Sequence, residues 1–76
     1  HGGWGALALA ANLFGLTAAE QKVLALLMQD QTPKQIAQAL SIQLSTVRTQ
    51  LSALLQKTGA RRQQELLRLI AAFPGG

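Results

Sequence analysis

The segment Ile36–Leu51, IAQALSIQLSTVRTQL, constrains the fold of this chain more than any other part. It contains two amphipathic runs at helical spacing, separated only by the residues Ser41–Gln43. A helix that ends and restarts within so few residues must turn sharply. The second run carries small polar residues and an arginine on the side away from its leucines. This pattern predicts a helix-turn-helix pair whose second helix exposes a polar, basic face.

The first helix of the pair has strong start signals. Thr32 is typical of an N-cap, and Gln35 completes a capping box with it. Pro33 is well placed at the first helical position, because its missing amide has no partner there. Only two turns fit before the break, where Ile42 is expected to pack inside the turn. The short inner face is predicted to consist of Ile36, Ala37 and Leu40.

The second helix is predicted over about residues 44–57, with Gly59 as its terminator. Its inward arc is expected to contain Leu44, Val47, Leu51, Leu54 and Leu55. The opposite arc contains Ser45, Arg48, Thr49, Ser52 and Gln56. A helix with one apolar and one polar arc packs its apolar side on the core and turns its polar side to water.

Three further helices are predicted around this pair. Thr17 and Glu20 form a capping box for a helix over about residues 18–29, which explains Glu20 without a catalytic role. The buried stripe of that helix is expected to be Ala19, Val23, Leu26 and Leu27. A leading helix is predicted over Trp4–Leu13 and a last helix from Gln63. The inward side of the last helix is expected to be Leu66, Leu69, Ile70 and Phe73.

These elements predict an all-α fold, a compact four-helix helix-turn-helix domain with an additional N-terminal leader helix. The predicted organisation is a leader or linker at residues 1–15, the domain at 16–73 and a tail at 74–76. We interpret the initial HGG as a remnant of expression cloning. A chain of 76 residues forms one small domain, and it needs nearly all of its large apolar residues for the core.

The formal net charge of +4 favours an anionic partner, and a merely solvated basic surface is the alternative. The absence of cysteine excludes disulfides and thiolate chemistry, and it fits a reducing cytoplasm. No apolar run reaches the roughly 18 residues that a bilayer span requires. No positive segment precedes the apolar start. Neither a membrane span nor a secretory signal is therefore predicted.

The chemistry-bearing side chains do not suggest a catalytic or metal site. The sequence has no paired carboxylates, Ser/His pairing, phosphate-binding loop or ligand cluster. His1 alone provides neither a metal site nor a general base. We predict that the domain is not an enzyme and that it binds no metal, cofactor or small-molecule ligand.

From Leu16 to about Leu67 the chain resembles the LuxR/GerE-type helix-turn-helix output domain of bacterial transcription regulators. The resemblance lies in LTAAEQKVLALL and PKQIAQALSIQLSTVRTQLSALLQKTGARRQQELL. The matching positions are Ile36, Ala37, Leu40, Ile42, Thr46, Val47, Arg48, Leu51, Lys57, Gly59, Glu65 and Leu66. The chain departs from the family pattern at Asp30, Gln31, Ser41, Gln43 and Gln50. Asp30 and Ser41 stand where the family usually has glycine, and Gln43 stands at its usual Ser/Thr cap.

The resemblance implies sequence-specific binding of double-stranded DNA, with the second helix in the major groove. The family positions that reach base edges map onto Arg48, Thr49 and Ser52. Arg48 is expected to read guanine, because its fork can donate to O6 and N7 together. The side chains expected to contact phosphates are Lys34, Ser45, Thr46, Gln50 and Lys57.

Family members bind DNA as dimers through the last helix, so a homodimer on DNA is expected. Leu67 and Ala71 flank the inward stripe of that helix and are the candidate dimer face, and the alternative is that Leu67 is an ordinary core residue or a scattered surface leucine. A regulator of this kind works in the bacterial cytoplasm, associated with the nucleoid when bound. A second hypothesis is a helical protein-interaction module that keeps the fold without DNA binding, because Ser41, Gln43 and Gln50 depart from the family pattern.

Overall fold

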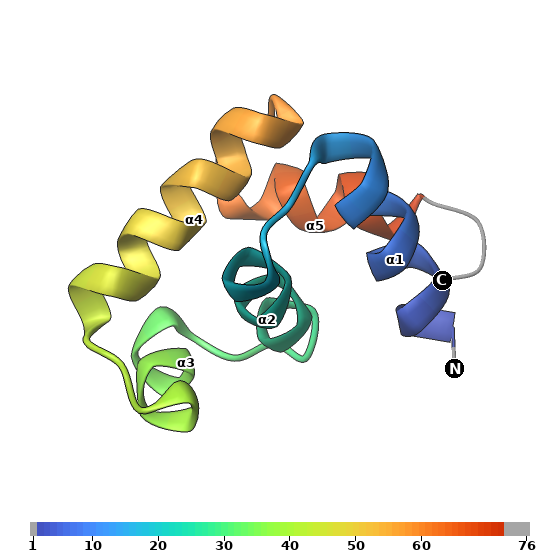
Figure 1. Ribbon diagram of the computed structural model, residues 1–76. Helices are drawn as coiled ribbons and strands as arrows, with labels where there is room; N and C mark the ends of the chain where they lie inside the picture. Colours follow the sequence, from blue (N-terminus) through green and yellow to red (C-terminus); the bar gives the residue numbers. More distant parts are fainter. Residues whose placement is uncertain (1, 73–76) are drawn as a thin grey trace.

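The computed structural model describes residues 2–72, and this part of the chain contains five helices and no strand (Figure 1). The helices are α1 (Gly2–Phe14), α2 (Ala18–Leu27), α3 (Pro33–Leu40), α4 (Leu44–Thr58) and α5 (Gln63–Ala71). The predicted all-α fold is confirmed, with α3 and α4 as the helix-turn-helix pair. Phe73 and the tail at 74–76, which the sequence analysis also assigned, lie outside the described residues.

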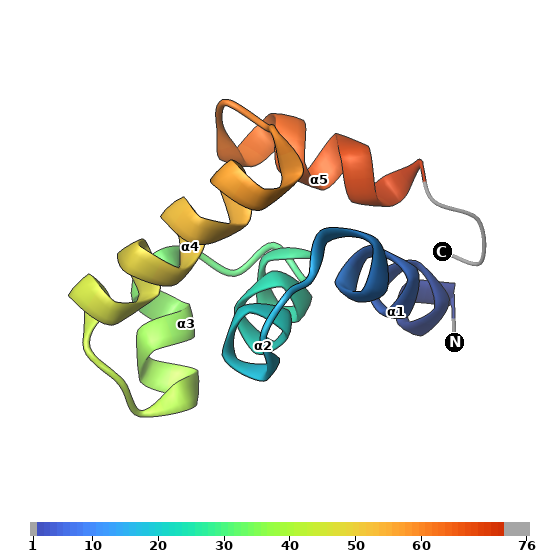
Figure 2. The same cartoon turned by 45° about the horizontal axis from the view of Figure 1, so that its top comes forward.

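Helix α2 lies at the centre of the domain. It contacts α1, α3 and α4, while α5 contacts α4 and α1. Figures 1 and 2 show α3 and α4 on one side of α2 and α1 on the other. The largest completely buried side chains come from four of the helices and are Val23, Leu24, Leu27, Ile36, Val47, Leu54, Leu66 and Ile70. One apolar cluster therefore holds α2 to α5 together.

Both predicted capping boxes are present. At the start of α2 the Glu20 amide donates to Thr17 Oγ1 (3.1 Å), and the Thr17 amide donates to Glu20 Oε1 (2.8 Å). At the start of α3 the Gln35 amide donates to Thr32 Oγ1 (3.2 Å), and the Thr32 amide donates to Gln35 Oε1 (2.9 Å). These bonds satisfy amides that a helix start otherwise leaves without partners, so they fix where α2 and α3 begin.

The buried stripe of α2 differs from the prediction. The buried residues are Glu20, Val23, Leu24 and Leu27, whereas Ala19 is exposed and Leu26 is half-buried. The stripe is rotated because α2 packs between α1 and α4, so both of its flanks are covered and the side of Leu24 turns inward. The helix also ends at Leu27 rather than at residue 29, because the chain turns over residues 28–30.

Two residues other than glycine adopt the left-handed backbone conformation. Asp30, after α2, has a φ of 64°, and Ser41, after α3, has a φ of 56°. At both sites the amide of the next residue donates to a carbonyl five positions earlier, at 3.2 Å after α2 and at 3.0 Å after α3. This closure of a helix end favours glycine, because a Cβ is strained at positive φ. Gly59 ends α4 in this conformation, as predicted, with a φ of 77°.

Helix α1 is an integral part of the packed domain. Ala10 is completely buried and Leu7 nearly so, and both belong to the same apolar cluster as the core of α2 to α5. The helix contacts α2 and α5, although the sequence placed it in a leader or linker outside the domain. The apolar core is therefore continuous across the predicted division at residue 16.

We expect Asp30→Gly and Ser41→Gly each to raise the free energy of unfolding by about 1 kcal/mol, because each removes the strain of a Cβ at positive φ. Urea unfolding with an unchanged m-value measures the gain. Gln38→Gly is the control, since Gln38 is exposed within α3 and a glycine there should cost about 1 kcal/mol. Loss of stability in both left-handed variants would contradict this account of the turns.

Overpacking tests whether α1 belongs to the domain. We expect Ala10→Leu to lower the free energy of unfolding by about 1–3 kcal/mol, because Ala10 has no exposed surface and the larger side chain must displace its neighbours. Ala8→Leu, on the exposed side of the same helix, should change it by less than about 0.5 kcal/mol. Equal effects of the two substitutions would mean that α1 is not packed as described.

Candidate nucleic-acid interface

Helix α4 exposes the face that the sequence predicted. Val47 and Leu54 are completely buried on its inner side. The residues of the opposite arc are all exposed, and they are Ser45, Arg48, Thr49, Ser52 and Gln56. The structure therefore presents the three expected base-contacting side chains, Arg48, Thr49 and Ser52, together on one open surface of a helix that is anchored from behind.

The start of α4 is fixed without a side-chain cap. Gln43 has the extended conformation of an N-cap, but its side chain accepts no bond from an amide of the helix. Its carbonyl accepts from the amides of Thr46 (3.0 Å) and Val47 (3.2 Å). The departure from a Ser/Thr cap thus leaves amides of the first turn open to another acceptor, while the helix still begins at the predicted residue.

The hydroxyl of Thr49 already donates a hydrogen bond within α4. Its Oγ1 donates to the Ser45 carbonyl at 3.0 Å, one turn earlier in α4. The oxygen can still accept a hydrogen bond, and the methyl group can contact an apolar edge such as a thymine methyl. Arg48 lies at the side of the same exposed arc, and its side chain makes no hydrogen bond or ion pair within residues 2–72.

Lys57 lies in a different setting from the exposed arc. Its Nζ donates to Glu20 Oε1 at 2.7 Å and to the Gly15 carbonyl at 3.3 Å. Glu20 is only 4% exposed, and the same oxygen accepts the Thr17 amide. The bond from Lys57 holds the pKa of Glu20 below its ordinary value, helped by Thr17 and opposed by burial. Lys57 thus ties the end of α4 to α2 and to the carbonyl that follows α1.

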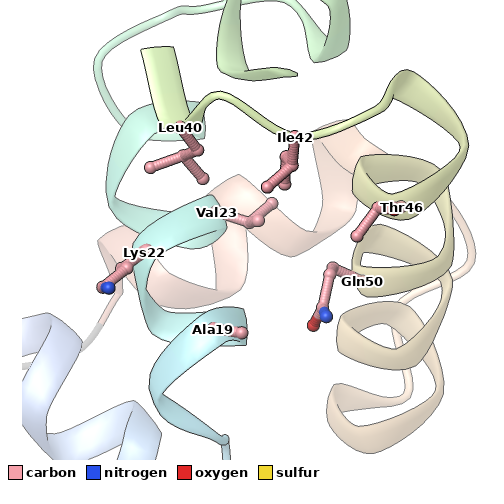
Figure 3. Close-up of a pocket in the computed structure, with 7 residues that line it drawn as sticks. All are labelled: Ala19, Lys22, Val23, Leu40, Ile42, Thr46 and Gln50. Carbon is pink, nitrogen blue, oxygen red and sulfur yellow. The ribbon is translucent and has the colours of Figure 1, made fainter. Parts of the chain in front are cut away.

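The structure separates the expected phosphate-contacting residues into groups. Ser45 lies on the exposed arc of α4, and Lys34 is exposed in the first turn of α3. Thr46 and Gln50 project from the flank of α4 into a cleft of about 250 Å³ that opens toward α2 (Figure 3). Lys57 has the partners described above, so its phosphate contact stays a prediction without support from its position.

The turn residue Ile42 does not pack inside the turn as expected. It is 37% exposed and lines the same cleft with Leu40. In Figure 3 the Ile42 side chain points from the turn toward Val23, over the space between α2 and α4. The cleft also includes Lys22 of α2, which the sequence analysis did not single out. Its only sequence signal is its place beside the apolar stripe of α2.

Only one of the two residues of the candidate dimer face on α5 is exposed. Leu67 is half-buried and packs against the core, as its alternative reading proposed, whereas Ala71 is exposed. Helix α1 contacts α5, so part of the α5 surface is already covered within one chain. Glu65 of α5 accepts the Arg61 amide at 3.1 Å, which ties the residue before the N-cap Arg62 to the first turn of the helix.

The comparison with protein families decides the family of this exposed helix-turn-helix. A model of the bacterial regulatory proteins of the LuxR family matches residues 15–70, from the end of α1 to the last buried residue of α5. The chain belongs to the LuxR family. Comparisons with curated proteins and with solved structures found no match.

The LuxR-family match covers α2 to α4 and α5 up to Ile70, and α1 lies outside it. No helix in the described part of this domain has both the length and the hydropathy to cross a membrane. Within residues 2–72, no three His, Cys, Asp or Glu side chains lie together as a metal site would require.

We expect Lys57→Met to lower the free energy of unfolding at neutral pH by about 1–3 kcal/mol, because it leaves the buried carboxylate of Glu20 without its cationic donor. Since the folded state lowers the pKa of Glu20, the bond contributes fully above the ordinary value of 4.5 and is lost as the pH falls below it. Urea unfolding at about pH 7 and about pH 2.5 should show the difference from the unsubstituted domain shrinking on acidification. An equal difference at both pH values would contradict the role of the ion pair.

Proposed function

We propose that this LuxR-family domain binds double-stranded DNA sequence-specifically, as the output domain of a bacterial transcription regulator. Helix α4 occupies the major groove. The observation that carries the proposal is the combination of a fully buried inner side at Val47 and Leu54 with an exposed polar arc around Arg48 and Thr49. An α-helix of about 10–12 Å diameter fits a groove about 12 Å wide, so a helix held in this way can enter it.

Base edges are read from the exposed arc of α4. Arg48 carries the main contact, since a guanidinium can donate to guanine O6 and N7 at once and discriminates by about 1–3 kcal/mol. Thr49 offers its methyl group or an acceptor oxygen, because its hydroxyl hydrogen is bonded within the helix. Ser52, one turn after Arg48, can donate to or accept from a neighbouring base. These roles use the three side chains that share the open surface.

Phosphate contacts set the register of α4 in the groove. Lys34 at the start of α3 and Ser45 at the start of α4 are exposed beside helix N-termini, where amides and the helix dipole favour an anion. Thr46 and Gln50 add neutral donors on the flank of α4. Lys57 supports the interface indirectly, through its bond to Glu20. The regulator acts on the chromosome, and we accordingly place it in the bacterial cytoplasm.

Two copies of the domain bind one DNA site. A single domain reads few base pairs, and a second copy extends the site and adds affinity by avidity. Ala71 on the exposed side of α5 is the candidate contact, while the core packing of Leu67 limits its part. Sedimentation of the complex with a selected duplex should give two domains per duplex, reduced to one by Ala71→Arg.

Selection of bound oligonucleotides from a random pool, followed by Arg48→Ala, tests the proposed function. We expect the substitution to weaken binding to the selected site by a factor of about 5–150, corresponding to about 1–3 kcal/mol. Arg68→Ala is the matched control, because Arg68 is an exposed arginine on α5. An enriched pool with no consensus, or no effect of Arg48→Ala, would instead favour a helical protein-interaction module.

A further inference from the structure

The cleft between α2 and α4 has an apolar floor and polar rims. Val23, Leu40 and Ile42 form the floor, with Ala19 at the edge. Thr46 and Gln50 project toward the opening from α4, while Lys22 lines the α2 side and its side chain points away from them (Figure 3). The lining thus offers a hydroxyl and an amide on the α4 side and, on the α2 side, a lysine whose ammonium must turn toward the opening to reach a bound group.

The three polar side chains at this cleft are unused within the domain. Lys22, Thr46 and Gln50 make no side-chain hydrogen bond or ion pair with the side chains and backbone that the structure describes. No carboxylate lines the cleft. The acid nearest in sequence to Lys22 is Glu20, and its carboxylate is held by Lys57. The rims therefore carry one positive charge and two neutral hydrogen-bonding groups without a counterion, a combination that suits an anion with several acceptor oxygens.

The cleft borders the helix that enters DNA. Counted at 100° per residue from the buried Val47, Thr46 and Arg48 lie on opposite flanks of α4. A helix nearly as wide as the major groove has a sugar-phosphate backbone along each flank. The backbone on the flank of Thr46 then runs over the mouth of the cleft, between α4 and Lys22 of α2.

We propose that this cleft is a contact site for a phosphodiester group of the DNA backbone, and that Lys22 is its charged positioning residue. The proposal rests on the proposed function, since it places α4 in the groove. Thr46 and Gln50 hydrogen-bond the phosphate oxygens from one side. Lys22, which extends to solvent in Figure 3, swings on its flexible stem to neutralise the charge from the other. The DNA backbone is thereby contacted by α2 as well as by the helix-turn-helix pair.

The salt dependence of binding to a duplex tests this site. Each phosphate neutralised by a cation releases counterions and adds about 0.9 to the slope of log affinity against log salt. We expect Lys22→Gln to lower that slope by about 1 and to weaken binding to selected and random duplexes by the same factor. Lys22→Arg, which keeps the charge, should retain the slope. Arg68→Gln removes the same charge from α5 and should leave the slope unchanged.

The outcomes separate this proposal from the proposed function. If Arg48→Ala impairs binding to the selected site but Lys22→Gln leaves the slope unchanged, the cleft does not contact phosphate and the DNA-binding function stands. An effect of Lys22→Gln on the selected sequence alone would make Lys22 a base-reading residue and would also overturn the proposal. If the unsubstituted domain binds no duplex at all, the proposed function fails on its own experiment. Lys22 is exposed, so its substitution leaves the fold intact, which an unchanged urea midpoint verifies.

Discussion

The position of α4 depends on the apolar contact between this helix and α2. Val47 and Leu54, two turns apart on α4, are completely buried, and they meet a central helix whose own Val23, Leu24 and Leu27 are buried in the same cluster. Two anchors along a helix fix its rotation as well as its position. Because the polar arc lies opposite these anchors, the rotation decides which side chains are open to a partner. The functional surface is thus a consequence of core packing, and it forms without any contact among the exposed residues themselves.

Sequence patterns predicted the parts of this arrangement that are local in the chain. The capping residues Thr17 and Thr32 start α2 and α3 where the pattern placed them, since a box of two residues three apart carries all the information it needs. The arcs of α4 follow from helical spacing in the same way. The rotation of the buried α2 stripe toward Leu24 could not be predicted from the sequence, because it depends on which helices cover the two flanks of α2. The packing of α1 on α5 escaped prediction for a related reason, as it joins the two ends of the chain.

The turns after α2 and α3 carry backbone strain, because this chain lacks the glycines that the family usually has there. Asp30 and Ser41 occupy left-handed positions that the closing hydrogen bonds of α2 and α3 impose. The chain keeps both turns because α2 and α3 start at capping boxes and α2, α3 and α4 share the common core, so the strained residue has no independent freedom to relax. Strain of this size, about 1–2 kcal/mol at each position, is small beside the burial of a helix face. The sequence departures therefore weaken the turns without changing their geometry.

The formal charge of the chain is a poor guide to the charge on the proposed DNA-facing side, because the cations have unequal surroundings. Lys57 is held by Glu20, so α4, the helix with the proposed base-reading arc, contributes Arg48 as its free cation within residues 44–58. Lys22 on α2 and Lys34 on α3 each supply one more cation. The remaining cations follow α4 in the chain and are Arg61, Arg62 and Arg68. Whether a lysine is available to phosphate is decided by an acid 37 residues away in the sequence, as the Lys57 pair shows. Motif matching alone treats Lys57 as available and passes over Lys22, whereas in the fold Lys57 is paired with Glu20 and Lys22 is unpaired on the helix beside α4.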